Sequence, residues 1–369
     1  MKKSSYQNYD AGIDVVRFLA FLFVFIHHFI FRGGNSISVD SQQFWSNSIV
    51  DRIAFFGSEG VTVFFCLSGY LLSKLLLKEL SDTGHISVRS FYLRRILRIW
   101  PLYFSYILFC LLASPILGNQ AIKNSELPTL LTFTYNWQQI YAGESRGMPA
   151  ILWSISVEEQ IYLVLPLLLV LFSKWNVTRL ALMLVLIGYV SRFSLFINDT
   201  SAYRNTFSYM STIGIGMFYA IHEVKFKIWF GKNRNFLTYI FIVFISIYIL
   251  SFKSIFSEGY LNIFAFDLTA FLTLCLLLML SGMQNQLHTR VLQPFAWLGR
   301  RTYGMYIFHW PVLAFMVSRN IFFKESQGVS LQGILFAFIL VVSISAFSYR
   351  FFEKPFLNLR KKYQYVKVG

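Results

Sequence analysis

The chain has 369 residues, of which 56% are hydrophobic, 19% are aromatic and only 14% are charged. A soluble globular protein carries about 25% charged residues, so this composition excludes an ordinary soluble domain. The net charge of +16 is compatible with nucleic-acid binding, but the basic residues fall in short segments between long apolar runs. That distribution follows the positive-inside rule, so we expect the lipid bilayer and no nucleic acid as a partner.

Apolar runs long enough to cross a hydrocarbon core of about 30 Å recur along the whole chain. We expect helices, because in lipid every backbone polar group must be satisfied within the protein. If both termini are cytoplasmic, most Lys and Arg residues fall in the cytoplasmic connections, as the positive-inside rule requires. Arg192 is among the few that then fall in the outer connections. The predicted fold is one all-α domain over residues 1–369, a multi-pass bundle of about ten helices in the cell (inner) membrane. The predicted spans are 12–32, 61–78, 99–117, 151–173, 178–198, 205–222, 236–253, 261–282, 303–319 and 332–352.

The first span carries three ionisable residues on one face. Arg17 and His28 are eleven residues apart, which at 100° per residue places them within about 20° of each other around the helix. Asp14 lies one turn before Arg17 on the same face, whereas His27 points about 80° away from Arg17. Ionisable side chains inside lipid are costly and usually functional. A structural Asp14–Arg17 pair with a buried structural histidine is the alternative interpretation.

The second span holds Ser68 and Gly69, at the end of the run Phe-Phe-Cys-Leu-Ser-Gly that begins at Phe64. Small residues of this kind allow two membrane helices to approach closely. The residues alone therefore favour a role in helix packing.

Three arginines, Arg94, Arg95 and Arg98, stand before Pro101 at the cytoplasmic start of the third span. Arginine matches phosphate oxygens in bidentate fashion, so the cluster suits a nucleotide-bearing donor such as coenzyme A. The alternative is that these arginines fix the orientation of the helix in the membrane, since arginines at a cytoplasmic helix end also contact lipid headgroups.

The fourth span begins at Trp153 and places Glu158 and Glu159 side by side in an apolar run. One carboxylate could pair with a histidine or arginine of another span, or bind a sugar hydroxyl. A purely structural ion pair is the alternative.

His309 lies near the middle of the ninth span, two residues before Pro311, which bends a helix. At the end of the tenth span we expect a structural ion pair between Arg350 and Glu353. No metal site or disulfide is predicted, because the cysteines all lie within apolar runs: Cys66, Cys110 and Cys275.

These segments, taken together and in order, resemble the acyltransferase family 3 membrane proteins, which include O-antigen and other polysaccharide O-acetylases. The resemblance covers nearly the whole chain, and it rests on six motifs in register rather than on any single one. Its opening motif selects His28 over His27. The matching segments are Asp14 with Arg17 and His28, then Phe64–Gly69, Arg94–Pro101, Trp153–Glu158, Gly299–Pro311 and Glu353–Pro355.

The resemblance implies transfer of an acetyl or other short acyl group from cytoplasmic acyl-CoA to a hydroxyl of a cell-surface polysaccharide or glycolipid. Acetyl-CoA is then a donor substrate, and no bound cofactor is implied. Some relatives carry an extracytoplasmic hydrolase-like domain; this chain would be a stand-alone version, for which a partner protein could complete the transfer. The alternative from another functional class is an exporter of a polysaccharide or lipid-linked glycan, although no matching pair of broken spans supports it.

The resemblance and the charged face of the first span together give each residue an expected role. His28 would act as general base or carry the acyl group. Arg17 would stabilise negative charge on the donor or on an oxyanion, with Asp14 orienting it. Glu158 would orient His28 or hold the acceptor. Acyl-CoA is expected to bind at Arg94, Arg95, Arg98 and Ser68, and acceptor binding or structural support is expected from Trp153, Ser156, Tyr303 and His309.

Overall fold

The computed structural model describes residues 11–32, 49–113, 122–143, 147–172, 176–198, 202–252, 261–281, 292–319, 321, 323–324 and 328–363. These residues are helical almost throughout, and one short antiparallel pair joins β1 (Phe323–Lys324) to β2 (Gly328–Val329). The predicted all-α fold is confirmed. The longer helices are α1 (Ala11–His27), α4 (Gly60–Thr83), α5 (Val88–Leu112), α9 (Trp153–Phe172), α10 (Val177–Ile197), α11 (Met210–Lys232), α12 (Arg234–Ser251), α13 (Asn262–Ser281), α16 (Thr302–Ser318) and α17 (Leu331–Ser348). The shorter ones are α3 (Ile49–Phe56), α7 (Leu127–Leu131), α8 (Tyr135–Tyr141), α15 (Gln293–Gly299) and α18 (Lys354–Arg360).

Eight helical segments of the described chain are long and apolar enough to cross a membrane, and they correspond to eight of the predicted spans. The protein is therefore a multi-pass membrane protein. The other two predicted spans, 205–222 and 303–319, are helical as well, as α11 and α16. α11 begins at Met210 rather than at residue 205, because the residues Thr206–Tyr209 form a 3-10 turn before it.

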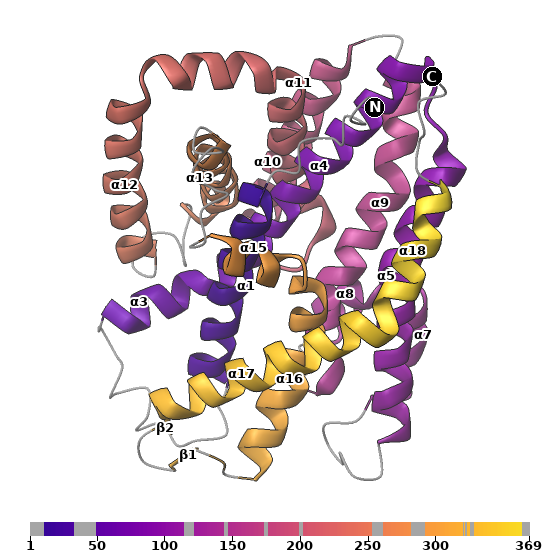
Figure 1. The fold of residues 1–369 in the computed structure, drawn as a ribbon, viewed down its shortest axis with the longest axis vertical. Coiled ribbons are helices and arrows are strands. Elements are labelled where there is room, and N and C mark those ends of the chain that lie inside the picture. Colours follow the sequence, from indigo (N-terminus) through magenta and orange to yellow (C-terminus); the bar gives the residue numbers. More distant parts are fainter. Residues whose placement is uncertain are drawn as a thin grey trace, which may run out of the picture.

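The helices are arranged around α1 (Figure 1). In this view α12 stands at one edge of the molecule, α5 and α18 lie at the opposite edge, and α17 runs obliquely across the bundle. Large apolar side chains on the peripheral helices are exposed, among them Leu171, Leu186 and Tyr239. Surface of this kind suits contact with lipid.

α5 begins well before the predicted span at residue 99. Its N-cap is Ser87, whose hydroxyl oxygen accepts a hydrogen bond from a backbone amide in the first turn. Arg94, Arg95 and Arg98 therefore lie within the body of a continuous helix instead of in a connection before it. Their side chains consequently point in different directions around the helix axis.

α4 and α11 cross at very close range through two glycines. A Cβ atom at Gly69 would lie 2.6 Å from the carbonyl oxygen of Ile213. A Cβ atom at Gly216 would lie 2.4 Å from the carbonyl oxygen of Cys66. Only glycine permits such an approach, so the packing role predicted for Gly69 is confirmed.

The prediction that Arg192 lies in an outer connection is wrong. Arg192 belongs to α10 and is 1% exposed inside the bundle. Its guanidinium pairs with Asp267 of α13 at 2.5 Å and donates to the hydroxyl of Ser211 at 2.7 Å. The carboxylate that allows this burial comes from a helix distant in sequence, which the pattern of α10 alone does not reveal.

The predicted ion pair between Arg350 and Glu353 is also wrong. A π-helical turn, η8 (Tyr349–Glu353), follows α17. Glu353 accepts a hydrogen bond from the hydroxyl of Ser348 at 3.2 Å, whereas the guanidinium of Arg350 lies 5.4 Å from the ring centroid of Phe351. The wider π turn carries the two side chains to different neighbours.

Candidate active site

A cavity with a net positive charge lies between α1, α4, α5, α9 and α16. Its empty space is about 840 Å³ when its open mouth is included. Among the described residues, Arg17, Arg95 and Arg98 line it, and Glu158 is the one acidic residue in its wall. Its uncharged polar lining consists of Ser68, Ser154, Tyr162, Thr302, Tyr303 and Tyr306.

Arg17 reaches the cavity from α1 and is held by Asp14. Its Nη1 atom lies 3.2 Å from Oδ1 of Asp14, and Oδ2 of the same carboxylate lies 3.9 Å from Nη1 of Arg300. Asp14 is only 3% exposed. α15 fixes this end of α1, because a Cβ atom on Gly299 would lie 1.8 Å from the carbonyl oxygen of Asp14. The predicted pairing of Asp14 with Arg17 is confirmed.

Arg95 and Arg98 of α5 present positive charge to the cavity. The Arg95 guanidinium lies 5.4 Å from the ring centroid of Phe91 and 5.3 Å from that of Tyr162. Across the described part of the chain, neither arginine forms an ion pair with a carboxylate. Two guanidinium groups without carboxylate partners make this end of the cavity a suitable place for an anion.

Arg94 does not line the cavity. Its guanidinium pairs with Glu79 at 3.2 Å and donates to the carbonyl oxygen of Tyr363 at 2.7 Å. The side chain thus ties α5 to α4 and to the segment after α18. This geometry favours a structural role for Arg94 over the expected role in acyl-CoA binding.

Glu158 and Ser68 form a polar wall of the cavity. The Ser68 hydroxyl donates to Oε1 of Glu158 at 2.8 Å, and the hydroxyl of Tyr162 donates a short hydrogen bond to the same oxygen. The neighbouring Glu159 turns elsewhere and accepts from the indole nitrogen of Trp100 at 3.0 Å. The two adjacent carboxylates therefore have separate partners, and Glu158 is the one that lines the cavity.

His28 forms a hydrogen-bonded pair with His309. Nδ1 of His28 lies 2.8 Å from Nε2 of His309, and the two rings are 11° from parallel. His309 is fully buried, and its Nδ1 atom lies 2.5 Å from the carbonyl oxygen of Tyr306. Neither histidine lines the cavity. His28 therefore has His309 as a hydrogen-bond partner, whereas Glu158, which was expected to orient His28, accepts from Ser68 and Tyr162 instead.

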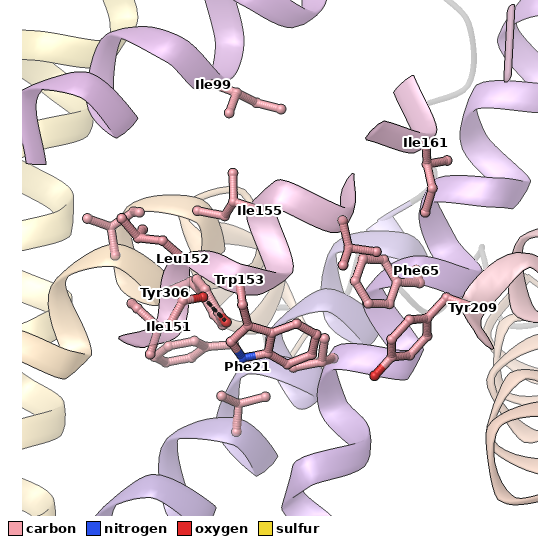
Figure 2. Packing of buried hydrophobic residues seen from close by; sticks show 14 of the residues in the cluster. Phe21, Phe65, Ile99, Ile151, Leu152, Trp153, Ile155, Ile161, Tyr209 and Tyr306 are labelled. Atoms are coloured by element: carbon pink, nitrogen blue, oxygen red, sulfur yellow. Dashed lines mark hydrogen bonds between the residues drawn. The ribbon is translucent and has the colours of Figure 1, made fainter. Parts of the chain in front are cut away.

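Tyr306 connects the cavity with the histidine pair. Its side chain lines the cavity, with the hydroxyl 2.7 Å from the hydroxyl of Ser154. The same hydroxyl donates to the carbonyl oxygen of Ile151 at 3.1 Å, as Figure 2 shows. Its backbone carbonyl meanwhile holds His309. One residue therefore contributes to both parts of the candidate site.

Three further predicted residues differ in how they contribute. Tyr303 lines the cavity, and its hydroxyl donates at 2.8 Å to a carbonyl oxygen of α5. Ser156 is fully buried and donates to the carbonyl oxygen of Leu152 at 3.2 Å. Trp153 is buried against the ring of Tyr203, with 5.0 Å between the centroids. Of these three, only Tyr303 contacts the cavity.

Tyr162 and Tyr306 were not predicted as site residues. Tyr162 follows Glu158 by four residues, and Tyr306 precedes His309 by three, so each lies one helical turn from a predicted site residue on the same face. That spacing was a usable signal. In the part of the chain that the structure describes, no cluster of three or more His, Cys, Asp or Glu residues could hold a metal ion.

Comparison with known proteins gives a family and several distant relatives. The family model described as an acyltransferase domain matches residues 10–350. The Putative O-acetyltransferase of Staphylococcus aureus (strain COL) is 25% identical over 98% of this chain and 61% of its own length. Peptidoglycan O-acetyltransferase OatA of Listeria monocytogenes is 24% identical over 95% of this chain and 56% of its own length. Putative peptidoglycan O-acetyltransferase YrhL of Bacillus subtilis is 25% identical over 96% of this chain and 56% of its own length.

The chain thus spans 56% to 61% of the length of these relatives. No solved structure matches it.

Proposed function

Since the chain belongs to the acyltransferase domain family over residues 10–350, we propose that it is a membrane O-acetyltransferase. It moves an acetyl or other short acyl group from acyl-CoA on the cytoplasmic side to a hydroxyl of a cell-surface polysaccharide or glycolipid. The relatives named O-acetyltransferases support acetyl as the group that is moved. The observation that carries the proposal is an arginine-lined cavity beside a histidine pair inside a membrane bundle.

The cavity suits the donor. Coenzyme A joins a phosphate-rich nucleotide to a long thioester arm, and the cavity joins Arg95 and Arg98 to an apolar wall that includes Phe64 and Ile99. Positive charge without a carboxylate partner is costly inside a membrane protein, so a bound polyanion would offset that cost. Arginine binds phosphate in bidentate geometry, which adds orientation to attraction.

The distance between Arg17 and His28 supports a role for Arg17 in binding the donor rather than in stabilising an oxyanion at His28. Arg17 lies on α1, and His28, eleven positions later, begins the π-helical segment that follows α1. At 1.5 Å per residue their backbones are separated by about 17 Å. Arg17 lines the cavity and His28 does not. Arg17 therefore binds the donor, and the thioester arm spans the distance to the histidine.

His28 is the proposed base. It accepts the proton of the acceptor hydroxyl while the hydroxyl oxygen forms a bond to the acyl carbon. The carbon–sulfur bond of the thioester then breaks, and the proton passes to the departing thiolate of coenzyme A. His28 is part-exposed, whereas His309 is fully buried, so an acceptor can approach His28 and not His309.

The acceptor is proposed to be a hydroxyl of a cell-envelope glycan. Two of the relatives carry peptidoglycan in their names, which makes peptidoglycan the first acceptor to test. Because the proposed reaction joins a cytoplasmic donor to such a glycan, the cell membrane is the proposed location of the protein. The multi-pass helical fold supports that location.

Replacing Arg98 by alanine is expected to raise the apparent KM for acetyl-CoA by roughly 10- to 100-fold, because one charge-assisted contact contributes about 1.5–3 kcal/mol. Inside-out membrane vesicles of the native host, made from a deletion strain carrying the variant, expose the cytoplasmic face to radiolabelled acetyl-CoA. Label transferred to glycan is measured against acetyl-CoA concentration.

The control is Arg89→Ala, which removes the same charge from the same helix at an exposed position outside the cavity. It should leave the apparent KM unchanged. An equal KM for the Arg98 and Arg89 variants would show that the cavity does not bind the donor.

A further inference from the structure

We propose that His309 is a positioning residue, which fixes the ring orientation and the tautomer of His28 so that Nε2 of His28 carries the lone pair. This inference rests on the proposed function, since it concerns the base of that reaction. His309 lies near the middle of α16, and it contacts His28, the residue that directly follows α1, across a sequence separation of 281 residues.

The positions of the protons on His309 and His28 follow from the groups that accept their two hydrogen bonds. A carbonyl oxygen can only accept, so the contact of 2.5 Å with Tyr306 requires the proton of His309 to be on Nδ1. A neutral His309 then has its lone pair on Nε2, which accepts from Nδ1 of His28 at 2.8 Å. The remaining nitrogen of His28, Nε2, is left as a proton acceptor. The backbone carbonyl of Tyr306 thus sets the donor and acceptor roles in both hydrogen bonds.

The surroundings of His309 favour its neutral form. The ring is fully buried, with the ring of Phe21 at 6.0 Å and that of Trp310 at 6.4 Å between centroids. No carboxylate of the described residues bonds to it. Burial without a charged partner disfavours an imidazolium, so His309 remains an acceptor toward His28.

The backbone at His28 is adapted to this contact. The α-helical hydrogen-bonding of α1 ends at His27, and a π-helical segment, η1 (His28–Arg32), begins at His28 itself. Segments of this kind are frequent at functional sites, because the wider turn re-aims a side chain. Trp310 packs against the same ring at 5.1 Å, so the orientation of His28 is held by two neighbours on α16.

When His28 accepts a proton it becomes an imidazolium, and its Nδ1–H then donates a charge-assisted hydrogen bond to His309. Such a bond is roughly twice as strong as a neutral one. The contact is therefore stronger in the transition state than in the resting protein, which is the condition for it to raise the rate of the chemical step.

The test compares His309→Leu with His309→Gln. Leucine removes the acceptor, whereas the side-chain oxygen of glutamine reaches close to the position of Nε2 and restores it. In the vesicle assay, His309→Leu should lower the rate at saturating acetyl-CoA by roughly 10- to 100-fold, the loss expected for one charge-assisted hydrogen bond. The apparent KM for acetyl-CoA should stay unchanged, since His309 does not line the cavity. His309→Gln should recover most of the rate.

Wild type and His28→Ala separate this inference from the proposed function. If wild type transfers no label, or His28→Ala matches wild type, the proposed function fails. If wild type transfers label and His28→Ala does not, the proposed function stands. A fully active His309→Leu, or equal losses in the leucine and glutamine variants, then overturns the role of His309.

Should both His309 variants fail to accumulate, the tautomer of His28 in the wild-type protein decides. Nitrogen-15 spectra of histidine-labelled protein, with His28→Ala as the assignment control, report which nitrogen is protonated. A proton on Nδ1 of His28 supports the inference, and a proton on Nε2 overturns it.

Discussion

Replacing His28 by alanine is expected to lower the rate of acyl transfer by roughly 10²- to 10⁴-fold, the usual contribution of a positioned general base. Binding of acetyl-CoA should be unchanged, because His28 lies outside the cavity that holds the arginines. Transfer is measured in the vesicle assay, and donor binding is measured separately with radiolabelled acetyl-CoA under conditions without turnover.

The matched control is His27→Ala. His27 is the last residue of α1 and immediately precedes His28, and its Nδ1 atom lies 3.0 Å from the carbonyl oxygen of Ala54 rather than beside His309. We expect it to keep most of the activity. Equal losses in the two variants would mean that truncating any ring at this end of α1 disturbs the helix, and His28 would lose its proposed role as base.

Replacing Gly299 by alanine is expected to reduce both stability and transfer. The new Cβ atom would lie 1.8 Å from the carbonyl oxygen of Asp14. Neither the Cβ atom nor the backbone oxygen can rotate out of the way, so α15 and α1 must move apart. Overpacking of this kind costs about 1–3 kcal/mol. A displacement of about 1 Å in the residues that hold a substrate can cost roughly 10²-fold in rate. Thermal unfolding in detergent and the vesicle assay measure the two effects.

Gly231→Ala serves as the control for this substitution. Gly231 lies near the end of α11, where an added Cβ atom meets nothing within 4 Å. That variant should keep the wild-type melting temperature and activity. A Gly299→Ala protein that is as stable and active as Gly231→Ala would show that α15 does not fix the Asp14–Arg17 pair.

Features set by local sequence could be predicted. Asp14 and Arg17 are one helical turn apart, so their pairing follows from helix geometry. Gly69 is small and lies in an apolar run, so its close packing follows from composition. The motif resemblance added the grouping of Arg17, Arg98 and Glu158, which the structure brings to one cavity.

Features set by contacts between distant helices could not be predicted. Arg192 looked like an outer basic residue because its partner, Asp267, is supplied by another helix. The pairing of His28 with His309 likewise depends on how α16 packs against α1. Spacing within one helix carries no information about either contact.

Features set by where a helix begins, or by a local change of helix type, were missed as well. α5 begins at Val88, so Arg94 and Arg95 lie in a continuous helix and point about 100° apart. Arg95 lines the cavity, whereas Arg94 pairs with Glu79. The π turn at Tyr349–Glu353 separates Arg350 from Glu353. A shift of one residue in phase changes the direction of a side chain by about 100°, which is enough to move it from one neighbour to another.

The most direct test of the proposed function is the acyl content of cell-envelope glycans, measured by mass spectrometry. A deletion strain is compared with the same strain carrying wild type or His28→Ala, each at matched protein abundance. We predict that wild type restores O-acetylation of a specific glycan and that His28→Ala does not. Equal acetylation in all three strains, or loss of a surface glycan that remains normally acetylated inside the cell, would contradict the proposed transferase, and the second outcome would indicate an exporter.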